Sequence, residues 1–525
     1  MSNQLLTISN FTGGINDSED PSSILDIEVS DALNMHINSS GIVESRKGQL
    51  KLVTGNIYTT AEITSIFGMT LSTGSEATIL TTSIEMYALS ATNVLSTLNI
   101  GFTPIANVLW RWVGFNDHLI GVSDKTALGT ANPVAYWNGS TGSNVVTLNQ
   151  TVTASITSPI DIAIWNNRVC IAQGVEVFFS DASEQEDWLS GDSQVIRFRG
   201  TTFDEENITA IFPFQGKLIV FKKSSIWEID PGDGPAESWV VRQIGFNIGC
   251  DARFSIVDIG RDLLFANQSG YNSLADIRDR GGLAPSGRVT QNVYRNYWAT
   301  IDPDYIHKIV AIFNPHLEEV MVAFPYSGST KNNMVMIINT RYSQINGKPS
   351  IWMYTYNSNP ACFSQRPNID RELIEMGSQD GQIMRLNSGT GDGTTTATYT
   401  SYVKYILTKR FDFKEAVKNK EFNSSYLYLT QSDDKQVSVT IYFNNQQRSK
   451  TYAINVYGVS AKWDVAKWDV DKWSAVKKGI HKGNLTFVAR DIQYSILNNN
   501  DQFTFSVDKI IIDLIALEDD VLLGR

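Results

Sequence analysis

Alternation of apolar and polar residues, broken at short intervals by turn-forming residues, dominates this chain. Few windows show the spacing of an amphipathic helix. Runs rich in β-branched and aromatic residues recur instead, and clusters of Asn, Asp and Gly bound them, which is typical of strands joined by tight turns. Representative runs are 107–113, 217–221, 262–266 and 437–443. The pattern predicts a mainly β protein.

The strands and turns form a weak repeat. An apolar strand, a polar turn and a second apolar strand recur at steps of about 46 to 50 residues, a spacing found in propeller blades. The turns lie at 116–118, 166–168, 215–217 and 260–262, with related units near 73–75, 314–316 and 380–381. We therefore predict a β-propeller of about six or seven blades over residues 61–395. Two consecutive β-sandwiches are the alternative architecture.

The pattern changes near the C-terminus. Residues 386–396 are rich in Gly, Thr and Ser, which predicts a linker or a long exposed turn. Longer alternating strands follow at 399–413, 425–430, 436–443, 485–490 and 503–517. They predict a β-sandwich-like ring or platform domain over residues 396–525. Residues 1–60 are predicted to be an N-terminal docking segment with the first strands, so the 525-residue chain has several domains.

Charge is unevenly distributed along the chain. The formal net charge is -12, but residues 404–482 hold 15 Lys and Arg against 8 Asp and Glu, a local +7 that leaves -19 for the rest. Such asymmetry is typical of parts that face different partners, and equally of uneven solvated surfaces. An acidic chain is a poor candidate for tight duplex DNA binding, because phosphate contacts need clustered Lys and Arg.

Three isolated cysteines, Cys170, Cys250 and Cys362, make a disulfide framework or a zinc site improbable. We expect them to be buried small hydrophobic residues of a protein folded in a reducing cytosol. The first residues lack a basic segment followed by a long apolar one, so no signal peptide is expected. No apolar stretch has the length of a membrane span.

The most specific motif lies in the first 50 residues. Gly13 and Gly14 permit backbone conformations closed to other residues, and residues 41–48 are predicted to form an exposed strand with a basic end. Taken alone, the segment fits an ordinary hairpin entry. The motif residues are Phe11, Gly13, Gly14, Asn16, Ala32, Asn34, Gly41, Arg46 and Gly48.

This arrangement resembles the opening of many bacteriophage tail and head-completion proteins. Residues 177–181 with Asp187 and Trp188, and a Lys-Trp-Asp series near the C-terminus, are similar to the same proteins. The resemblance implies a tail nozzle or tail hub subunit of a short-tailed phage, with a propeller displayed outward and β-domains forming a ring. Such rings are typically hexameric. It also implies contacts with portal and adaptor ring proteins and with tail fibre or tip proteins.

The resemblance places the protein in the virion tail, assembled in the host cytoplasm. Its expected function is structural: a conduit for genome ejection, through which DNA passes without specific binding because like charge weakens adhesion to phosphates. We expect Phe11, Gly13, Gly14, Asn34 and Arg46 to contact a neighbouring subunit or partner. The N-terminal segment would dock across subunits by strand addition.

Three tryptophans recur with a period of five in the segment 460–475. Neither a helix nor a strand gathers residues of that period on one side, so an extended loop is expected. Trp463, Trp468 and Trp473 could wedge against a neighbouring subunit, or the loop could pack on its own domain. A charge flanks each ring, so stable membrane insertion is not expected.

Motifs that carry chemistry are scarce. The five histidines form no close metal-ligand pair, and no nucleophile elbow or Walker loop is present. Acidic residues at 184–187 and 204–206 could bind a cation but are more typical of solvated loops. We therefore predict that the protein is not an enzyme and has no catalytic residue, cofactor or metal site. A receptor-binding or glycan-degrading propeller protein of the virion is the alternative, and glycan cleavage would require paired carboxylates in a cleft.

Overall fold

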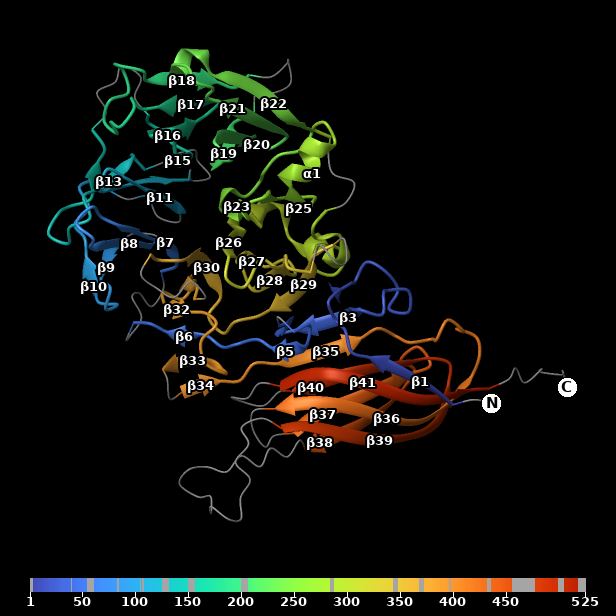
Figure 1. The fold of residues 1–525 in the computed structure, drawn as a ribbon. Coiled ribbons are helices and arrows are strands. Elements are labelled where there is room, and N and C mark those ends of the chain that lie inside the picture. Colours follow the sequence, from blue (N-terminus) through green and yellow to red (C-terminus); the bar gives the residue numbers. More distant parts are fainter. Residues whose placement is uncertain are drawn as a thin grey trace.

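The computed structural model describes residues 3–517, except 39, 54–60, 83–84, 104, 106–107, 125–131, 150–155, 200–205, 284–287, 343–347, 368–372, 396–397, 432–435, 456–476 and 499–504. Within these residues the chain is built of strands, short 3-10 turns and one short α-helix, α1 (Leu274–Asp279). The mainly β prediction is confirmed. Figure 1 shows a propeller above a β-sandwich, with the N-terminal strands between them.

In the described residues seven blades form the propeller, within the predicted range of six or seven. Blades 1 to 5 are separate small sheets, and blades 6 and 7 are parts of larger sheets. Their innermost strands lie next to one another around the ring, and the last of them, β30, contacts the first, β7. Blade 1 consists of β7 (Ile63–Thr70), β8 (Glu76–Thr82), β9 (Met86–Leu89) and β10 (Leu95–Thr97). Blade 2 consists of β11 (Trp110–Phe115), β12 (His118–Ser123), β13 (Ala135–Trp137) and β14 (Val146–Thr147). Blade 3 consists of β15 (Asp161–Trp165), β16 (Arg168–Gln173), β17 (Glu176–Phe179) and β18 (Gln194–Arg197). Blade 4 consists of β19 (Ile208–Phe214), β20 (Lys217–Lys222), β21 (Ser225–Asp230) and β22 (Val240–Phe246).

The later blades are less regular. Blade 5 has three strands, β23 (Val257–Asp258), β24 (Leu263–Asn267) and β25 (Gly270–Ser273), followed by α1. Blade 6 has β26 (Val310–Asn314), β27 (Glu319–Phe324), β28 (Met334–Asn339) and β29 (Ser350–Tyr354), and blade 7 has β30 (Pro360–Ser364), β31 (Glu375–Ser378) and β32 (Ile383–Arg385). The fourth strand of blade 7 is β6 (Leu50–Lys51), which precedes blade 1 in the chain and closes the ring.

The predicted repeat corresponds to one hairpin, the turn between the first and second strands of a blade. Asn116 and Asp117 both have positive φ, as do Asn166 and Asn167, and Gln215 and Gly216. Two-residue hairpin turns of type I′ need positive φ at both central positions, which Asn, Asp and Gly tolerate best. The turn at 380–381 instead joins the second and third strands of blade 7, which explains the irregular spacing there.

The sandwich consists of two sheets. Sheet A contains, in order, β39 (Lys477–Ala489), β36 (Lys420–Gln431), β41 (Phe505–Ala516), β5 (Val43–Ser45) and β4 (Met35–Ile37), and β1 (Asn3–Ile8) also pairs with β41. Sheet B contains β3 (Glu28–Leu33), β35 (Lys404–Thr408), β40 (Ile492–Asn498), β37 (Gln436–Phe443) and β38 (Arg448–Asn455). Strand β2 (Gly14–Ile15) pairs with β3, and β29 of blade 6 also pairs with β3, so sheet B continues into the propeller.

Propeller and sandwich share one hydrophobic core. Buried residues of blade 6, such as Val322, join those of the N-terminal segment, such as Val29, and of the sandwich, such as Ile496 and Ile512, in a single cluster. The N-terminal residues are distributed among both sheets of the sandwich and blade 7. The two parts are therefore held together by buried apolar contacts as well as by the chain connection.

The prediction of a linker at 386–396 was wrong. Strand β33 (Asp392–Thr395) pairs with β6 and with β34 (Thr398–Thr400), and Asp392 is buried. Asp392 faces a buried partner, Arg46, and not solvent. Strands β38 and β40 lie where the sequence pattern had predicted none. Among the described residues, no helix is long and apolar enough to cross a membrane.

Candidate functional site

Arg46 is the centre of the joint between propeller and sandwich. Its Nη1 and Nη2 each donate to one carboxylate oxygen of Asp392, at 2.8 Å, and both side chains are about 1% exposed. Its Nε donates to Asn34, and its remaining N–H groups donate to the carbonyl oxygens of Lys47 and Thr355. All five guanidinium donors are thus used, which a buried charge requires.

Two tyrosine rings enclose this ion pair. The guanidinium carbon of Arg46 lies 3.7 Å from the ring centroid of Tyr402 and 4.3 Å from that of Tyr356. Burial disfavours the charged guanidinium, but the charge and hydrogen bonds of Asp392 outweigh burial and raise the pKa of Arg46. The predicted exposed strand with a basic end was therefore wrong, because partners from three distant segments bury its arginine.

Asn34 and Gly48 also lie in the joint between propeller and sandwich. Asn34 has a φ of 57°, and its amide nitrogen donates to Val403 O at 2.7 Å and to Thr355 Oγ1 at 3.0 Å. A Cβ added to Gly48 would stand 1.9 Å from the carbonyl oxygen of Gly391, so only glycine fits there. The Asn34, Arg46 and Gly48 parts of the motif meet in space and connect blade 7 to the sandwich.

The first part of the motif packs against blades 5 and 6. Phe11 is 1% exposed and lies in the shared core. Gly14 has a φ of 70°, and an added Cβ would stand 2.5 Å from the backbone nitrogen of Ile351, while one on Gly13 would meet the Glu28 side chain. Asn16 donates to Glu28 at 2.9 Å. These glycines permit close approach of the N-terminal segment to β29.

The structure thus places Phe11, Gly13, Gly14, Asn34 and Arg46 inside their own chain. It brings Asn34 and Arg46 together and leaves Phe11 and the two glycines at a separate contact. Whether any of them also contacts a neighbouring subunit stays a prediction. Trp463, Trp468 and Trp473 lie outside the described residues. Asp392, the partner of Arg46, was missed because its segment has linker composition.

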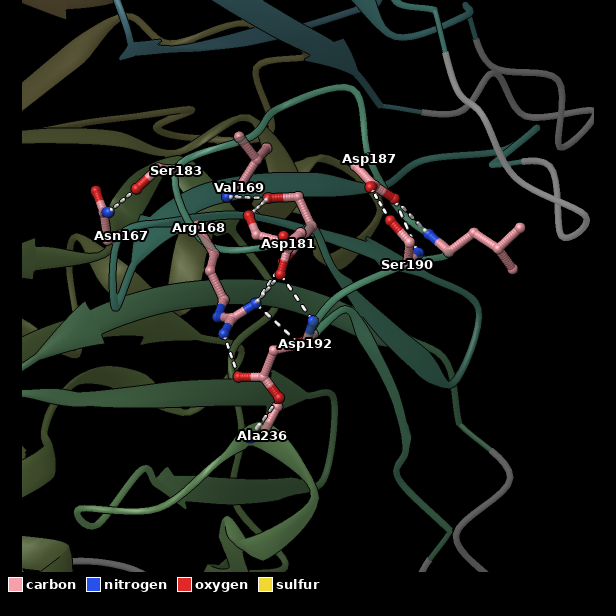
Figure 2. Close-up of polar contacts among 11 residues, drawn as sticks. Asn167, Arg168, Val169, Asp181, Ser183, Asp187, Ser190, Asp192 and Ala236 are labelled. Atoms are coloured by element: carbon pink, nitrogen blue, oxygen red, sulfur yellow. Dashed lines mark hydrogen bonds and ion pairs between the residues drawn. The ribbon is translucent and has the colours of Figure 1, made fainter.

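Polar groups hold the loop at 180–192 of blade 3, which contains Asp187 and Trp188 of the second sequence motif (Figure 2). Arg168 donates from Nη1 to the carbonyl oxygens of Ser180 and Asp192, both at 2.8 Å, and its Nη2 pairs with the Asp192 carboxylate. Asp192 in turn accepts from the backbone nitrogen of Ala236 in blade 4, at 3.0 Å. The loop therefore connects neighbouring blades.

Two acidic residues of this loop, Asp181 and Asp187, accept hydrogen bonds from backbone donors. Asp181 accepts from the backbone nitrogen of Asp192 at 2.8 Å, and Asp187 accepts from those of Leu189 and Ser190 at 3.0 and 2.9 Å (Figure 2). The hydrogen bonds of Ser190 lower the pKa of Asp187. Among the described residues, no group of three His, Cys, Asp or Glu side chains could hold a metal ion. The Asp181 and Asp187 carboxylates thus stabilise the conformation of the loop.

A buried ion network fills the propeller axis at one level. Arg253, which precedes blade 5, donates from Nη2 to the carbonyl oxygen of Leu109 at the start of blade 2, at 2.6 Å. Arg111 on β11 donates to Arg253 O at 2.6 Å and to the fully buried carboxylate of Asp161 at 3.1 Å. The ring of Phe254 lies against both guanidinium groups. Because Arg253 reaches across the ring, the axis is not an open channel at this level.

Sheet A ends in a long strand whose outer edge has no partner among the described residues. Strand β39 pairs with β36 on one side only. Ile480 and Val488 on this strand are 60% and 50% exposed. Beyond β41, strand β1 likewise pairs on one side only, and its Leu5 is 70% exposed. Long strand edges with exposed apolar side chains are ready to pair with another chain.

A polar cavity of about 300 Å³ lies between the β4–β5 hairpin and blade 6. Its wall contains two carboxylates, Glu44 and Glu319, and two histidines, His36 and His316. Burial raises the pKa of Glu319, whereas for Glu44 burial is outweighed by His36 and Asn38, which lower its pKa. The sequence did not predict that Glu44 and Glu319 line one cavity, because the two residues are far apart in the chain and share no motif.

Comparisons with known proteins do not assign this chain to a family. No protein-family model and no curated protein matches the chain. Among solved structures, the designed protein Ika8 is 11% identical and covers 65% of this chain and 99% of its own, with a TM-score of 0.34. The Pan2 WD40 domain of Neurospora crassa is 9% identical, with 68% and 99% covered and a TM-score of 0.38. BamB of Moraxella catarrhalis is 11% identical, with 73% and 97% covered and a TM-score of 0.36. The assignment of seven blades therefore depends on the strand pairing of this chain itself.

Proposed function

We propose that this protein is a structural ring subunit of the tail nozzle or hub of a short-tailed phage. The observation that carries the proposal is the long edge of sheet A, where β39 has no partner among the described residues and exposes Ile480 and Val488. A buried joint holds this sheet against the propeller, so copies joined through β39 would carry their propellers in a defined orientation. The phage assignment depends on the resemblance of the N-terminal motif, of which Asn34, Arg46 and Gly48 lie in that joint.

Strand directions favour head-to-tail assembly. Strands β39, β36, β41 and β1 alternate in direction across sheet A, because each pairs antiparallel with the next. A second copy in the same orientation would therefore bring its β1 antiparallel to β39 and continue the ladder. Head-to-tail contacts close into rings when the rotation per copy permits. Pairing of two β39 edges about a twofold axis would instead give a dimer and leave both β1 edges free.

The conduit in this proposal runs between copies and not through the propeller. The network of Arg111, Arg253 and Asp161 fills the propeller axis. Outside residues 404–482 the chain carries an excess of acidic residues, which would weaken adhesion of DNA to the lumen. Six copies, portal and adaptor contacts, fibre or tip contacts and a virion location follow from the sequence resemblance and belong to the proposal.

The assembly can be tested on the purified full chain by sedimentation velocity and by imaging of single particles. We expect a closed ring for the wild type and monomers for the double variant Ile480→Lys/Val488→Lys, with unchanged thermal unfolding. Val417→Lys is a matched control, because Val417 is 82% exposed and lies outside β39; this variant should still form rings. A wild type that stays monomeric at every concentration would overturn the proposal. Antibody labelling of intact virions at the tail would test the location.

A further inference from the structure

The polar cavity beside the β4–β5 hairpin is built from segments that only the fold brings together. His36 and Glu44 come from the hairpin, Glu319 and Asn339 from blade 6, and Tyr354 from the end of β29. The volume of about 300 Å³ is at the lower end of the range for small-molecule sites. A ligand of the size of one sugar ring would fit such a space.

The wall of the cavity has balanced charges. Lys47 and Arg341 supply two cations, and Glu44 and Glu319 supply two carboxylates. A phosphate would need an excess of cations. Among the described residues, no three His, Cys, Asp or Glu side chains lie close enough together to hold a metal ion. The remaining polar groups are amides, imidazoles and a phenol, which hydrogen-bond without a fixed charge. This composition favours a neutral, hydroxyl-bearing ligand.

Hydrogen bonds fix the two carboxylates in place. Glu44 accepts from Asn38 at 3.0 Å and lies 3.4 Å from Nε2 of His36. Glu319 accepts from Asn339 at 3.3 Å. The His36 ring stands edge-on to Tyr354, with 6.3 Å between the ring centroids. Side chains held in this way lose little freedom when a ligand binds, which lowers the entropy cost of binding.

The His36 ring is held inside this wall. Its Nε2 faces the Glu44 carboxylate, and its Nδ1 is buried without a hydrogen-bond partner among the described residues. Because protein atoms enclose Nδ1, the ring contributes to the cavity by positioning Glu44.

We propose that this cavity binds a single neutral saccharide residue. Glu44 and Glu319 accept hydrogen bonds from its hydroxyl groups, Asn339 completes the polar wall, and His36 positions Glu44 through Nε2. Ile37 and Leu317, which also line the cavity, contact the C–H groups of the ring. The proposal does not depend on ring assembly, because every lining residue belongs to one chain.

Saturation-transfer NMR and calorimetry on the full chain test this proposal. The probes are glucose, galactose, mannose and N-acetylglucosamine, with inorganic phosphate and free glutamate as charged comparators. We expect at least one neutral sugar to bind and both charged probes to fail. The variant His36→Phe keeps a ring beside Tyr354 but removes both nitrogens, and should weaken sugar binding at least ten-fold.

The matched control is His118→Phe in blade 2, because His118 also lies against a tyrosine, with 4.7 Å between its ring centroid and that of Tyr136. This variant should bind sugar as the wild type does. The assembly variant Ile480→Lys/Val488→Lys should also bind normally, which separates a failure of this site from a failure of the ring. If the wild type binds none of the neutral sugars, or if His36→Phe leaves binding unchanged, the saccharide site is excluded.

Discussion

The propeller and the sandwich are both built from antiparallel sheets, but they differ in how their strand edges end. Each of the first three blades ends in a short outer strand, β10, β14 or β18, of two to four residues. Sheet A of the sandwich ends in β39, which has 13 residues. Short edges offer few groups for pairing, whereas a long edge can template a second chain. The outer strand of blade 4, β22, is longer, with seven residues and an exposed Val240, but β39 is longer still. The sandwich therefore offers the longer edge for assembly.

The joint between the two regions connects the edge strand β39 to the position of the propeller. The shared core and the Arg46–Asp392 pair hold the open sandwich against the closed propeller. A contact made through β39 would then determine where each propeller lies in an assembly. Substitutions in the joint and at the closure of the propeller, and alkylation of the buried cysteines, test this difference between the two regions.

The largest effect is expected at the joint. Arg46→Met leaves the buried carboxylate of Asp392 without its partner, which should reduce the free energy of unfolding by about 3–5 kcal/mol. Urea unfolding followed by tryptophan fluorescence measures this loss. Arg197→Met is the control, because Arg197 forms an ion pair with Glu176 but its side chain is 54% exposed. That variant should lose at most about 1 kcal/mol, and equal losses in both variants would contradict the proposed role of the joint.

A smaller effect is expected where β6 closes the propeller. The backbone nitrogen of Leu52 donates to Ile383 O at 2.9 Å. Leu52→Pro removes this donor, whereas Leu52→Ala shortens the side chain but keeps the donor. The proline variant should be less stable than the alanine variant by about 1–3 kcal/mol in the same unfolding measurement. Equal stabilities would show that this hydrogen bond contributes little to closure.

The smallest effect concerns the cysteines, all three of which are free and buried, as the sequence predicted. Burial raises the pKa of Cys250 and of Cys362 to about 12, and it also raises the pKa of Cys170. Since the thiolate is the reactive form, native protein at neutral pH should resist alkylation by iodoacetamide. Mass spectrometry should find no modified cysteine before unfolding and three after it. Rapid labelling of the native protein would contradict the closed core.

Local signals predicted the blades because their hairpin turns have strict backbone requirements. The pairs Asn116–Asp117 and Asn166–Asn167 can be recognised in the sequence, since few residues tolerate positive φ at both positions. The pairings of β6 with β32 and of β3 with β29 join residues hundreds of positions apart. No local pattern encodes such contacts, so the closure of the ring and the continuation of sheet B could not be predicted.

The candidate sites were harder to predict for the same reason. The motif containing Asn34, Arg46 and Gly48 was recognised, but a lone arginine among polar residues predicts exposure. Its burial depends on Asp392, Tyr356 and Tyr402, which only the fold brings near. The cavity of Glu44 and Glu319 likewise joins a hairpin to a distant blade. Composition identified the residue types but not their neighbours.

Cross-linking between β39 and β1 tests the central claim most directly. The variant Leu5→Cys/Ile480→Cys places one reactive thiol on each edge, and a bismaleimide reagent can bridge them without knowledge of the register. The account predicts a ladder of covalent multimers on a denaturing gel for this variant and none for Leu5→Cys or Ile480→Cys alone. Dimers formed by Ile480→Cys alone would show twofold pairing of β39, and the absence of any multimer would contradict assembly through these edges.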